Sequence, residues 1–335
     1  MKNIYYYYHS LIMSHLPRHF WLMFLLVLSV GGCDRLHDDP CSDYRQAMRG
    51  FVVRISETAR ETNSHFVVIT QNGVELVTEN GEADGNWASR YLSAIDGVGQ
   101  EDLFYGYDGD GIATPANETN HLLGFLRRLH TDRKAILVTD YCTDNQQMAT
   151  SATRCDEEGF VPYAPPSREL NRISTTPPLH ENNDDITHLN EVRNFLYLIN
   201  PEGFANKSAF IAAVCATNYD LLIMDLFFDG EAFTAEEIEQ LRNKANGGRR
   251  MVMSYMSIGE AESYRYYWQQ SWKRHRPVWL DKENPDWEGN YKVHYWNSDW
   301  QEIICGAGDS YLNRILHAGF DGVYLDIIDA FEYYE

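Results

Sequence analysis

Six acidic or amide residues follow apolar segments, at the positions where buried strands would end. Carboxyl groups at such positions can protonate a leaving oxygen, attack as nucleophiles or activate water, which is the chemistry of glycoside cleavage. No Ser-His-Asp order, GxSxG motif or GxGxxG turn accompanies them. No CxxC or Cys/His cluster has zinc spacing, so we expect neither a metal nor a cofactor. The six residues are Asn72, Glu101, Asp140, Asp225, Glu260 and Asp326.

Aromatic and basic side chains occur close to these acids in the sequence. Tyrosine faces offer apolar area to sugar rings. Each acid alone could equally cap a helix or form an ion pair. We expect Asp225 and Glu260 to bind substrate and to suit a cationic amino group, with Arg265 either joining them or neutralising Glu260. The neighbouring residues are Tyr105, Tyr141, Tyr255, Tyr324 and Arg265.

Eight apolar segments alternate with helical segments, which predicts a single-domain (β/α)8 barrel of the TIM type. An open, doubly wound sheet is the alternative. Barrel enzymes build their sites at the C-terminal ends of the strands, so one rim would carry all six polar residues. The predicted strands are residues 65–73, 92–106, 135–142, 160–164, 194–199, 219–230, 249–260 and 322–328.

The first and last predicted elements lack their partners. Residues 43–63 form an amphipathic helix that follows no strand, and the strand at 322–328 has no helix after it. Because the ends of a closed barrel are neighbours, this helix can cover that strand. The other predicted helices are residues 121–134, 145–159, 205–216, 234–248 and one within 299–318. Thr234 and Glu237 form a capping box, and Gly247 ends that helix.

Several longer blocks resemble a known family. Residues 254–268, 284–304 and 319–335, with shorter stretches near 71–76, 94–106, 137–142 and 159–163, are similar to the glycoside hydrolases related to endo-α-1,4-polygalactosaminidase, family 114. The resemblance covers residues 43–335 except 165–190 and implies an exported (β/α)8 barrel. In the family the blocks of residues 254–335 come first, so the two halves here look circularly permuted, with residues 165–190 as the linker.

The resemblance also implies roles for particular residues. Asp326 and Glu101 would be the catalytic pair, with Glu101 as acid/base and Asp326 as nucleophile. The substrate would be a galactosamine-like polysaccharide. The substrate-binding residues would be Asp225, Glu260, Arg265, Asn72, Asp140, Tyr105, Tyr255 and Tyr324. The alternative is a carbohydrate-binding barrel without catalysis.

The N-terminal residues predict export. Residues 20–30 are an apolar run suited to a signal peptide, which we place at 1–33, and Cys33 follows two glycines as in a lipobox. We therefore expect a cell-envelope lipoprotein, anchored to the membrane at Cys33 and tethered by residues 34–42. Export permits disulfides, and Cys142 and Cys155 are the nearest pair in sequence.

The formal net charge of −21 argues against nucleic acid as a partner and suits either a cationic ligand or simple solubility.

Asp329 is predicted to be a rim or capping residue. A loop rich in aromatic residues follows Arg265, and it could wall a sugar groove or pack over the barrel. Its aromatic residues include Trp287, Tyr291, Tyr295 and Trp296.

Overall fold

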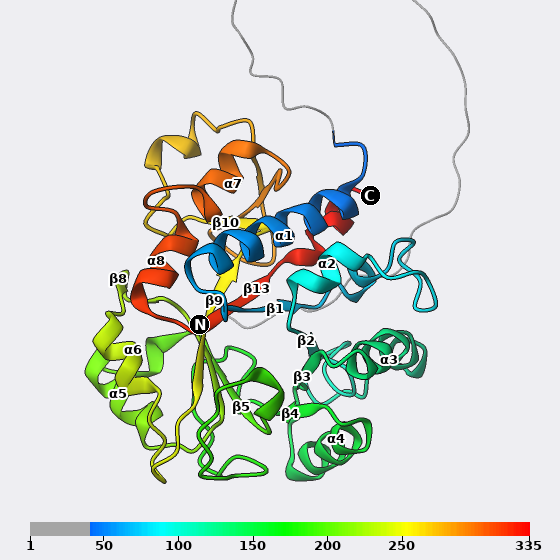
Figure 1. Ribbon diagram of the computed structural model, residues 1–335, viewed down its shortest axis with the longest axis vertical. Coiled ribbons are helices and arrows are strands. Elements are labelled where there is room, and N and C mark those ends of the chain that lie inside the picture. Colours follow the sequence, from blue (N-terminus) through cyan, green and yellow to red (C-terminus); the bar gives the residue numbers. More distant parts are fainter. Residues whose placement is uncertain (1–40) are drawn as a thin grey trace, which may run out of the picture.

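The computed structural model describes residues 41–335, so the expected signal peptide, Cys33 and residues 34–40 of the tether lie outside it. Eight parallel strands form a nearly closed (β/α)8 barrel, which confirms the predicted TIM-type fold (Figure 1). The sheet order is β4-β3-β2-β1-β13-β9-β6-β5, and β4 also contacts β5. The strands are β1 (Val67–Gln71), β2 (Gly97–Glu101), β3 (Ala135–Thr139), β4 (Val161–Tyr163), β5 (Phe195–Leu198), β6 (Leu221–Met224), β9 (Met251–Ser257) and β13 (Gly322–Asp326).

Helices pack around this sheet, and most lie where the periodicity places them. They are α1 (Tyr44–Thr62), α2 (Ser89–Ala94), α3 (Ala116–Thr131), α4 (Asn145–Glu158), α5 (Lys207–Cys215), α6 (Ala235–Leu241), α7 (Ser298–Cys305) and α8 (Tyr311–Ala318). Short 3-10 turns are η1 (Val74–Val77), η2 (Leu189–Glu191), η3 (Pro201–Gly203), η4 (Gln270–Lys273) and η5 (Ile328–Tyr333).

Three helix predictions were wrong in extent, the first because α3 begins at Ala116 and ends at Thr131, where residues 121–134 were expected. The capping box of Thr234 and Glu237 is present, but α6 ends at Leu241, and Gly247 lies in a turn beyond it. The chain leaves the helix because Asn243 bridges to Arg249. The helix expected within residues 299–318 is two helices, α7 and α8, since Gly308 adopts a positive φ of 76° between them.

The first and last strands of the barrel are hydrogen-bonded neighbours. β1 pairs with β13 in parallel, from Val67 opposite Gly322 to Thr70 opposite Leu325. Helix α1 packs against α2, α7, α8 and η5 with its apolar face buried (Figure 1). Arg45 also forms an ion pair with Glu335 at 2.9 Å. Helix α1 therefore covers the region where the first and last strands meet.

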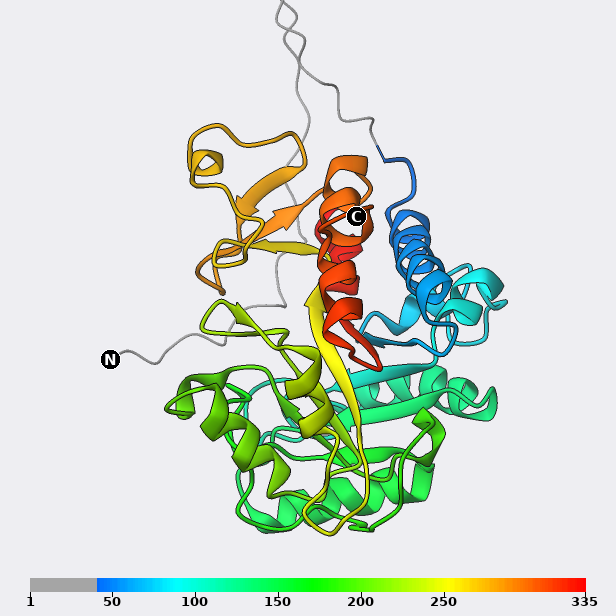
Figure 2. The same cartoon turned by 60° about the vertical axis from the view of Figure 1, so that its left-hand side comes forward.

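Two small antiparallel sheets were not predicted, because their strands are short and, apart from the apolar β7, which lies within the strand predicted at 219–230, mostly polar. β10 (Glu260–Glu262), β12 (Asn290–Val293) and β11 (Leu280–Glu283) form a three-stranded sheet in that order. It lies beyond the C-terminal end of β9, beside the barrel (Figure 2). The short strands β7 (Phe227–Phe228) and β8 (Glu231–Ala232) form a hairpin.

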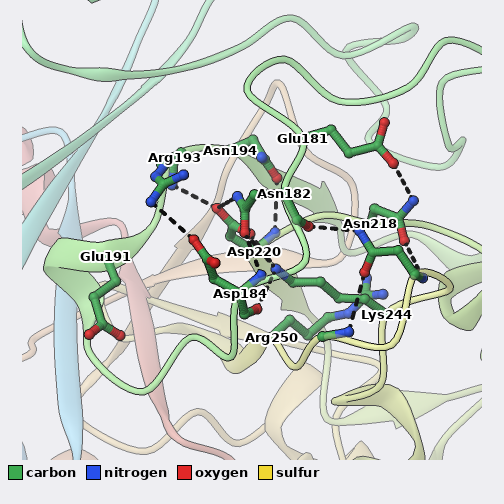
Figure 3. Close-up of polar contacts among 12 residues, drawn as sticks. Glu181, Asn182, Asp184, Glu191, Arg193, Asn194, Asn218, Asp220, Lys244 and Arg250 are labelled. Carbon is green, nitrogen blue, oxygen red and sulfur yellow. Dashed lines mark hydrogen bonds and ion pairs between the residues drawn. The ribbon is translucent and has the colours of Figure 1, made fainter.

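Residues 164–194 join β4 to β5 without an α-helix, and a buried ion pair anchors them. Lys244 donates to Asp220 at 2.6 Å and to the carbonyl of Asp184 at 2.9 Å (Figure 3). Asn182 donates to Asp220 at 3.0 Å, and both ionic side chains are fully buried. Asp220 directly precedes β6, so this cluster lies at the N-terminal end of the barrel.

None of the helices in residues 41–335 is both long and apolar enough to cross a membrane. The five cysteines in this part of the chain are free thiols, so Cys142 and Cys155 are not joined.

The buried ion pair generates a stability prediction. Lys244→Met should lower the free energy of unfolding by roughly 3–5 kcal/mol, because Asp220 would keep a buried charge without its cation. Chemical denaturation at neutral pH measures this. Arg90→Met is the matched control, because the Arg90–Glu57 pair is exposed and should be worth less than about 1 kcal/mol. Equal stability of the two variants would contradict the anchoring role.

Candidate active site

A cavity of about 890 Å³ opens at the C-terminal ends of the barrel strands. Its wall is strongly acidic, with eleven carboxylate side chains and only two cationic ones, Arg168 and Arg265. Such an excess of negative charge favours a cationic ligand. The acids are Glu101, Asp102, Glu169, Glu202, Asp225, Asp229, Glu260, Glu262, Glu288, Asp326 and Asp329.

Asp326 ends β13 and lines this cavity. Its Oδ2 accepts a hydrogen bond from the Tyr255 hydroxyl at 2.6 Å, and its Oδ1 accepts one from the Ile327 amide at 2.8 Å. Burial, together with the nearby charges of Glu101 and Glu260, raises the pKa of Asp326 to about 7, although the hydrogen bonds oppose this shift. The carboxyl can therefore exchange a proton near neutral pH.

Glu101 ends β2, and a single strand, β1, separates β2 from β13 in the barrel. Gln71 donates to its Oε2 at 2.5 Å, and the Tyr141 hydroxyl donates to its Oε1. The side chain of Asn72 accepts the backbone N–H of Glu101 at 3.1 Å. Asn72 therefore orients the strand end that carries Glu101, and the expected catalytic pair lines one cavity.

The backbone turns sharply directly after three strand ends at this rim. Asn72, Asp102 and Ile327 each have a φ of 57°, in the left-handed region. Asn and Asp adopt this conformation more readily than most residues, but it is costly for a β-branched one such as Ile327. Strain of this kind is retained where the surrounding structure imposes it, and it concentrates at functional sites. Here each turn follows a side chain that lines the cavity.

A second group of charges forms the opposite part of the cavity wall. Arg265 pairs with Asp225 at 2.7 Å and with Glu262 at 2.5 Å. Burial raises the pKa of Asp225, although Arg265 opposes this shift. The expectation that Arg265 neutralises Glu260 was wrong, because Glu262 and Asp225 occupy its guanidinium.

Glu260 is fully buried in the cavity wall. Its Oε1 accepts hydrogen bonds from Asn284 at 2.8 Å and from Tyr333 at 3.4 Å. Burial raises its pKa, and these hydrogen bonds reduce the shift. Glu260 and Asp225 thus lie where substrate-binding residues were expected.

Three predicted binding residues do not line the cavity. Asp140 is fully buried and accepts hydrogen bonds from the Phe104 and Tyr105 amides and from Ser151, so it holds the loop after β2. Tyr105 takes part in that loop through its backbone. Tyr324 lies in the barrel interior below Asp326, against Tyr197 and close to Gly99. We therefore correct these three from substrate contacts to supporting residues.

Several cavity residues were missed by sequence reasoning. Gln71 precedes Asn72, and its place at a strand end was a usable signal. Glu262 lies just beyond the strand predicted at 249–260, and Arg168 lies in the segment predicted as a linker, so no strand pattern marked them. Asp329 lines the cavity, which fits the rim position expected for it, and burial with the charge of Asp326 raises its pKa to about 8. The missed residues are Gln71, Asp102, Tyr197, Glu262 and Arg168.

The aromatic loop divides between the two expected roles. Trp287 in this loop, and Tyr264 just before it, line the cavity with 52% and 63% of their surface exposed. Tyr291 and Tyr295 are buried in the packing of the loop, and Trp296 contacts His294, Tyr295 and Tyr334. Exposed aromatic faces at a cavity mouth suit sugar rings. Within residues 41–335, no group of three His, Cys, Asp or Glu side chains is arranged to hold a metal ion.

The fold and cavity define an acid-lined TIM barrel. Residues 211–334 match the sequence model of glycoside-hydrolase family GH114, which confirms the resemblance to this family for that part of the chain. The matched part contains Asp225, Glu260 and Asp326 but not Glu101.

Three curated relatives, all uncharacterized proteins, share part of the sequence. One from Methanocaldococcus jannaschii is 38% identical over 156 residues, which is 46% of this chain and 42% of the relative. Relatives from Thermotoga maritima and Deinococcus radiodurans are 38% and 44% identical over 121 residues, 36% of each chain. The chain thus spans about two fifths of the length of the curated relatives that it matches.

The raised pKa of Asp326 generates a pH prediction. Its folded-state pKa of about 7 exceeds the ordinary value of 3.8, so the folded chain loses stability as the pH rises from about 4 through 7. Asp326→Asn should be more stable than the native protein at pH 8, by roughly 2 kcal/mol. The difference should vanish near pH 4. Chemical denaturation at both pH values measures it.

The exposed Asp132 provides a matched control, since Asp132→Asn should change stability by less than about 0.5 kcal/mol at either pH. A native protein that is as stable as Asp326→Asn at pH 8 would contradict the burial of an unfavourable charge at Asp326.

Proposed function

We propose that the protein is a glycoside hydrolase whose catalytic pair is Asp326 and Glu101. The observation that carries this proposal is that both carboxyl groups, each with hydroxyl or amide donors, line one cavity at the C-terminal rim of the barrel. The match of residues 211–334 to family GH114 supports it. This chemistry needs one proton donor and one carboxylate.

In the proposed reaction, the two carboxyl groups share one proton, and from Glu101 it passes to the glycosidic oxygen as the bond between that oxygen and the anomeric carbon breaks. The Asp326 carboxylate attacks the anomeric carbon and forms an ester. Glu101 then removes a proton from water, which attacks the same carbon and releases the sugar and the Asp326 carboxylate. Tyr255 donates a hydrogen bond to Asp326 and orients it for the attack.

The proposed substrate is a polysaccharide of galactosamine-like, positively charged amino sugars. The eleven carboxylates of the cavity favour ammonium groups. Asp225 and Glu260 are the proposed substrate carboxylates, and the exposed faces of Tyr264 and Trp287 would receive sugar rings. An anionic polymer would meet repulsion from the same wall.

We further propose that the chain is a circular permutation of the family barrel. The pairing of β1 with β13 and the irregular segment between β4 and β5 support this order. We also propose that the protein is exported and anchored to the membrane by a lipid on Cys33, with residues 34–42 tethering the single barrel. The sequence of residues 1–33 supports export and anchoring.

Glu101→Gln distinguishes a hydrolase from a binding protein. For a hydrolase, we expect turnover of deacetylated polygalactosamine to fall by about 10²–10⁴-fold, with binding of the polymer retained. The measurement is release of reducing ends, alongside isothermal titration with an oligosaccharide of the same sugar. The acetylated polymer tests the requirement for positive charge.

Glu57→Gln is the matched control, because Glu57 lies outside the cavity in an exposed pair with Arg90, and its turnover should equal that of the native protein. If the native protein binds the polymer and releases no fragments, the carbohydrate-binding alternative holds and catalysis is refuted.

A further inference from the structure

The segment that follows β4 returns to the cavity instead of passing over the surface. Arg168, Glu169 and Leu170 lie within the region expected to be a linker, and all three line the cavity wall. Arg168 is one of only two cationic side chains there, and 16% of its side chain is exposed. A cation placed among so many acids by an otherwise irregular segment indicates a specific role.

The guanidinium of Arg168 has a defined position. It pairs with Asp102 at 3.1 Å and with Asp110 at 2.6 Å, and it donates to the carbonyl of Gly106 at 3.0 Å. Its planar group also lies over the ring of Tyr141, 3.6 Å from the ring centroid. A planar fork that pairs and stacks at once is a property of arginine that lysine lacks.

Two partners of Arg168, Tyr141 and Asp102, help to orient Glu101. Tyr141 donates its hydroxyl hydrogen bond to Glu101 Oε1. Asp102 directly follows Glu101 and holds the left-handed turn there, with a φ of 57°. One guanidinium therefore fixes both one of the two side-chain hydrogen-bond donors to Glu101 and the backbone beside it. A proton donor must lie within hydrogen-bond reach of the leaving oxygen, so small displacements reduce its contribution.

We propose that Arg168 is a positioning residue for Glu101, acting through Tyr141 and Asp102 during proton transfer to the leaving group. This inference rests on the proposed function, in which Glu101 is the acid/base. Arg168 is not assigned to substrate binding, because two carboxylates already pair with its guanidinium and a cationic sugar would be repelled by it.

Leaving-group dependence tests this role directly, since a good leaving group departs without a proton while a sugar alkoxide needs one. For Arg168→Gln, we expect kcat/KM on deacetylated polygalactosamine, which reports the first step, to fall about 10–100-fold, as part of the contribution of a general acid is lost. On a 2,4-dinitrophenyl glycoside of a galactosamine oligosaccharide, kcat/KM should fall less than about threefold, whereas kcat should also fall where the second step, in which Glu101 is the base, limits turnover. KM for the polymer should stay within about threefold.

Two further variants sharpen the test. Arg168→Lys keeps the charge but not the stacked fork, so it should show a smaller loss with the same selectivity for the polymer. Combining Arg168→Gln with Tyr141→Phe should add little to the larger single effect, because both act on Glu101 through one path. Arg172→Gln is the matched control in the same segment, because the Arg172 side chain is exposed, donates to the adjacent Asn171 and does not line the cavity, and it should leave both rates unchanged.

The outcomes are distinguishable. Equal losses of kcat/KM on polymer and activated glycoside, or a rise in KM for the polymer alone, would overturn the positioning role. If Arg168→Gln does not fold by circular dichroism, the Lys variant decides by the same comparison of the two substrates. If the native protein cleaves neither substrate, the proposed function fails first, and the role of Arg168 fails with it.

Discussion

The parallel pairing of β13 with β1 is the interaction on which the candidate site depends. β1 also pairs with β2, so β1 separates the strand that ends in Asp326 from the one that ends in Glu101. The close approach requires glycine at the start of β13, where a Cβ on Gly322 would lie 2.2 Å from the carbonyl oxygen of Val67. A shift of one residue in this register would turn the inward side chains outward.

The cost of this arrangement is the concentration of like charge. Burial and neighbouring acids raise the pKa of Asp326 to about 7 and that of Asp329 to about 8. Tyr255, Tyr141 and Gln71 offset part of this cost by donating to the two proposed catalytic carboxyl groups. The left-handed conformation of Ile327 adds backbone strain. Sites of this kind exchange stability for reactivity.

Much of the fold could be predicted because its main signals are local. Apolar strands such as 322–326 and the amphipathic helix at 44–62 carry clear periodicity, and the strand ends located Glu101 and Asp326. The three-stranded sheet of β10, β11 and β12 escaped prediction because its strands are short and polar. The sequence also did not reveal the directions of side chains. Asp140 and Tyr324 were therefore predicted to bind substrate in the cavity, whereas they support it from outside. Arg168 gave no local signal, since its role depends on partners more than 25 residues away.

The proximity of Glu101 and Asp326 can be measured without any substrate. The charge of Glu101 contributes to the raised pKa of Asp326, so removing it should favour the ionised form of Asp326. A carboxyl carbon NMR titration of Asp326 should give a pKa of about 7 in the native protein, and a value lower by at least about half a unit in Glu101→Gln. An unchanged pKa would show that the two carboxyl groups do not share one cavity, and it would contradict the proposed catalytic pair.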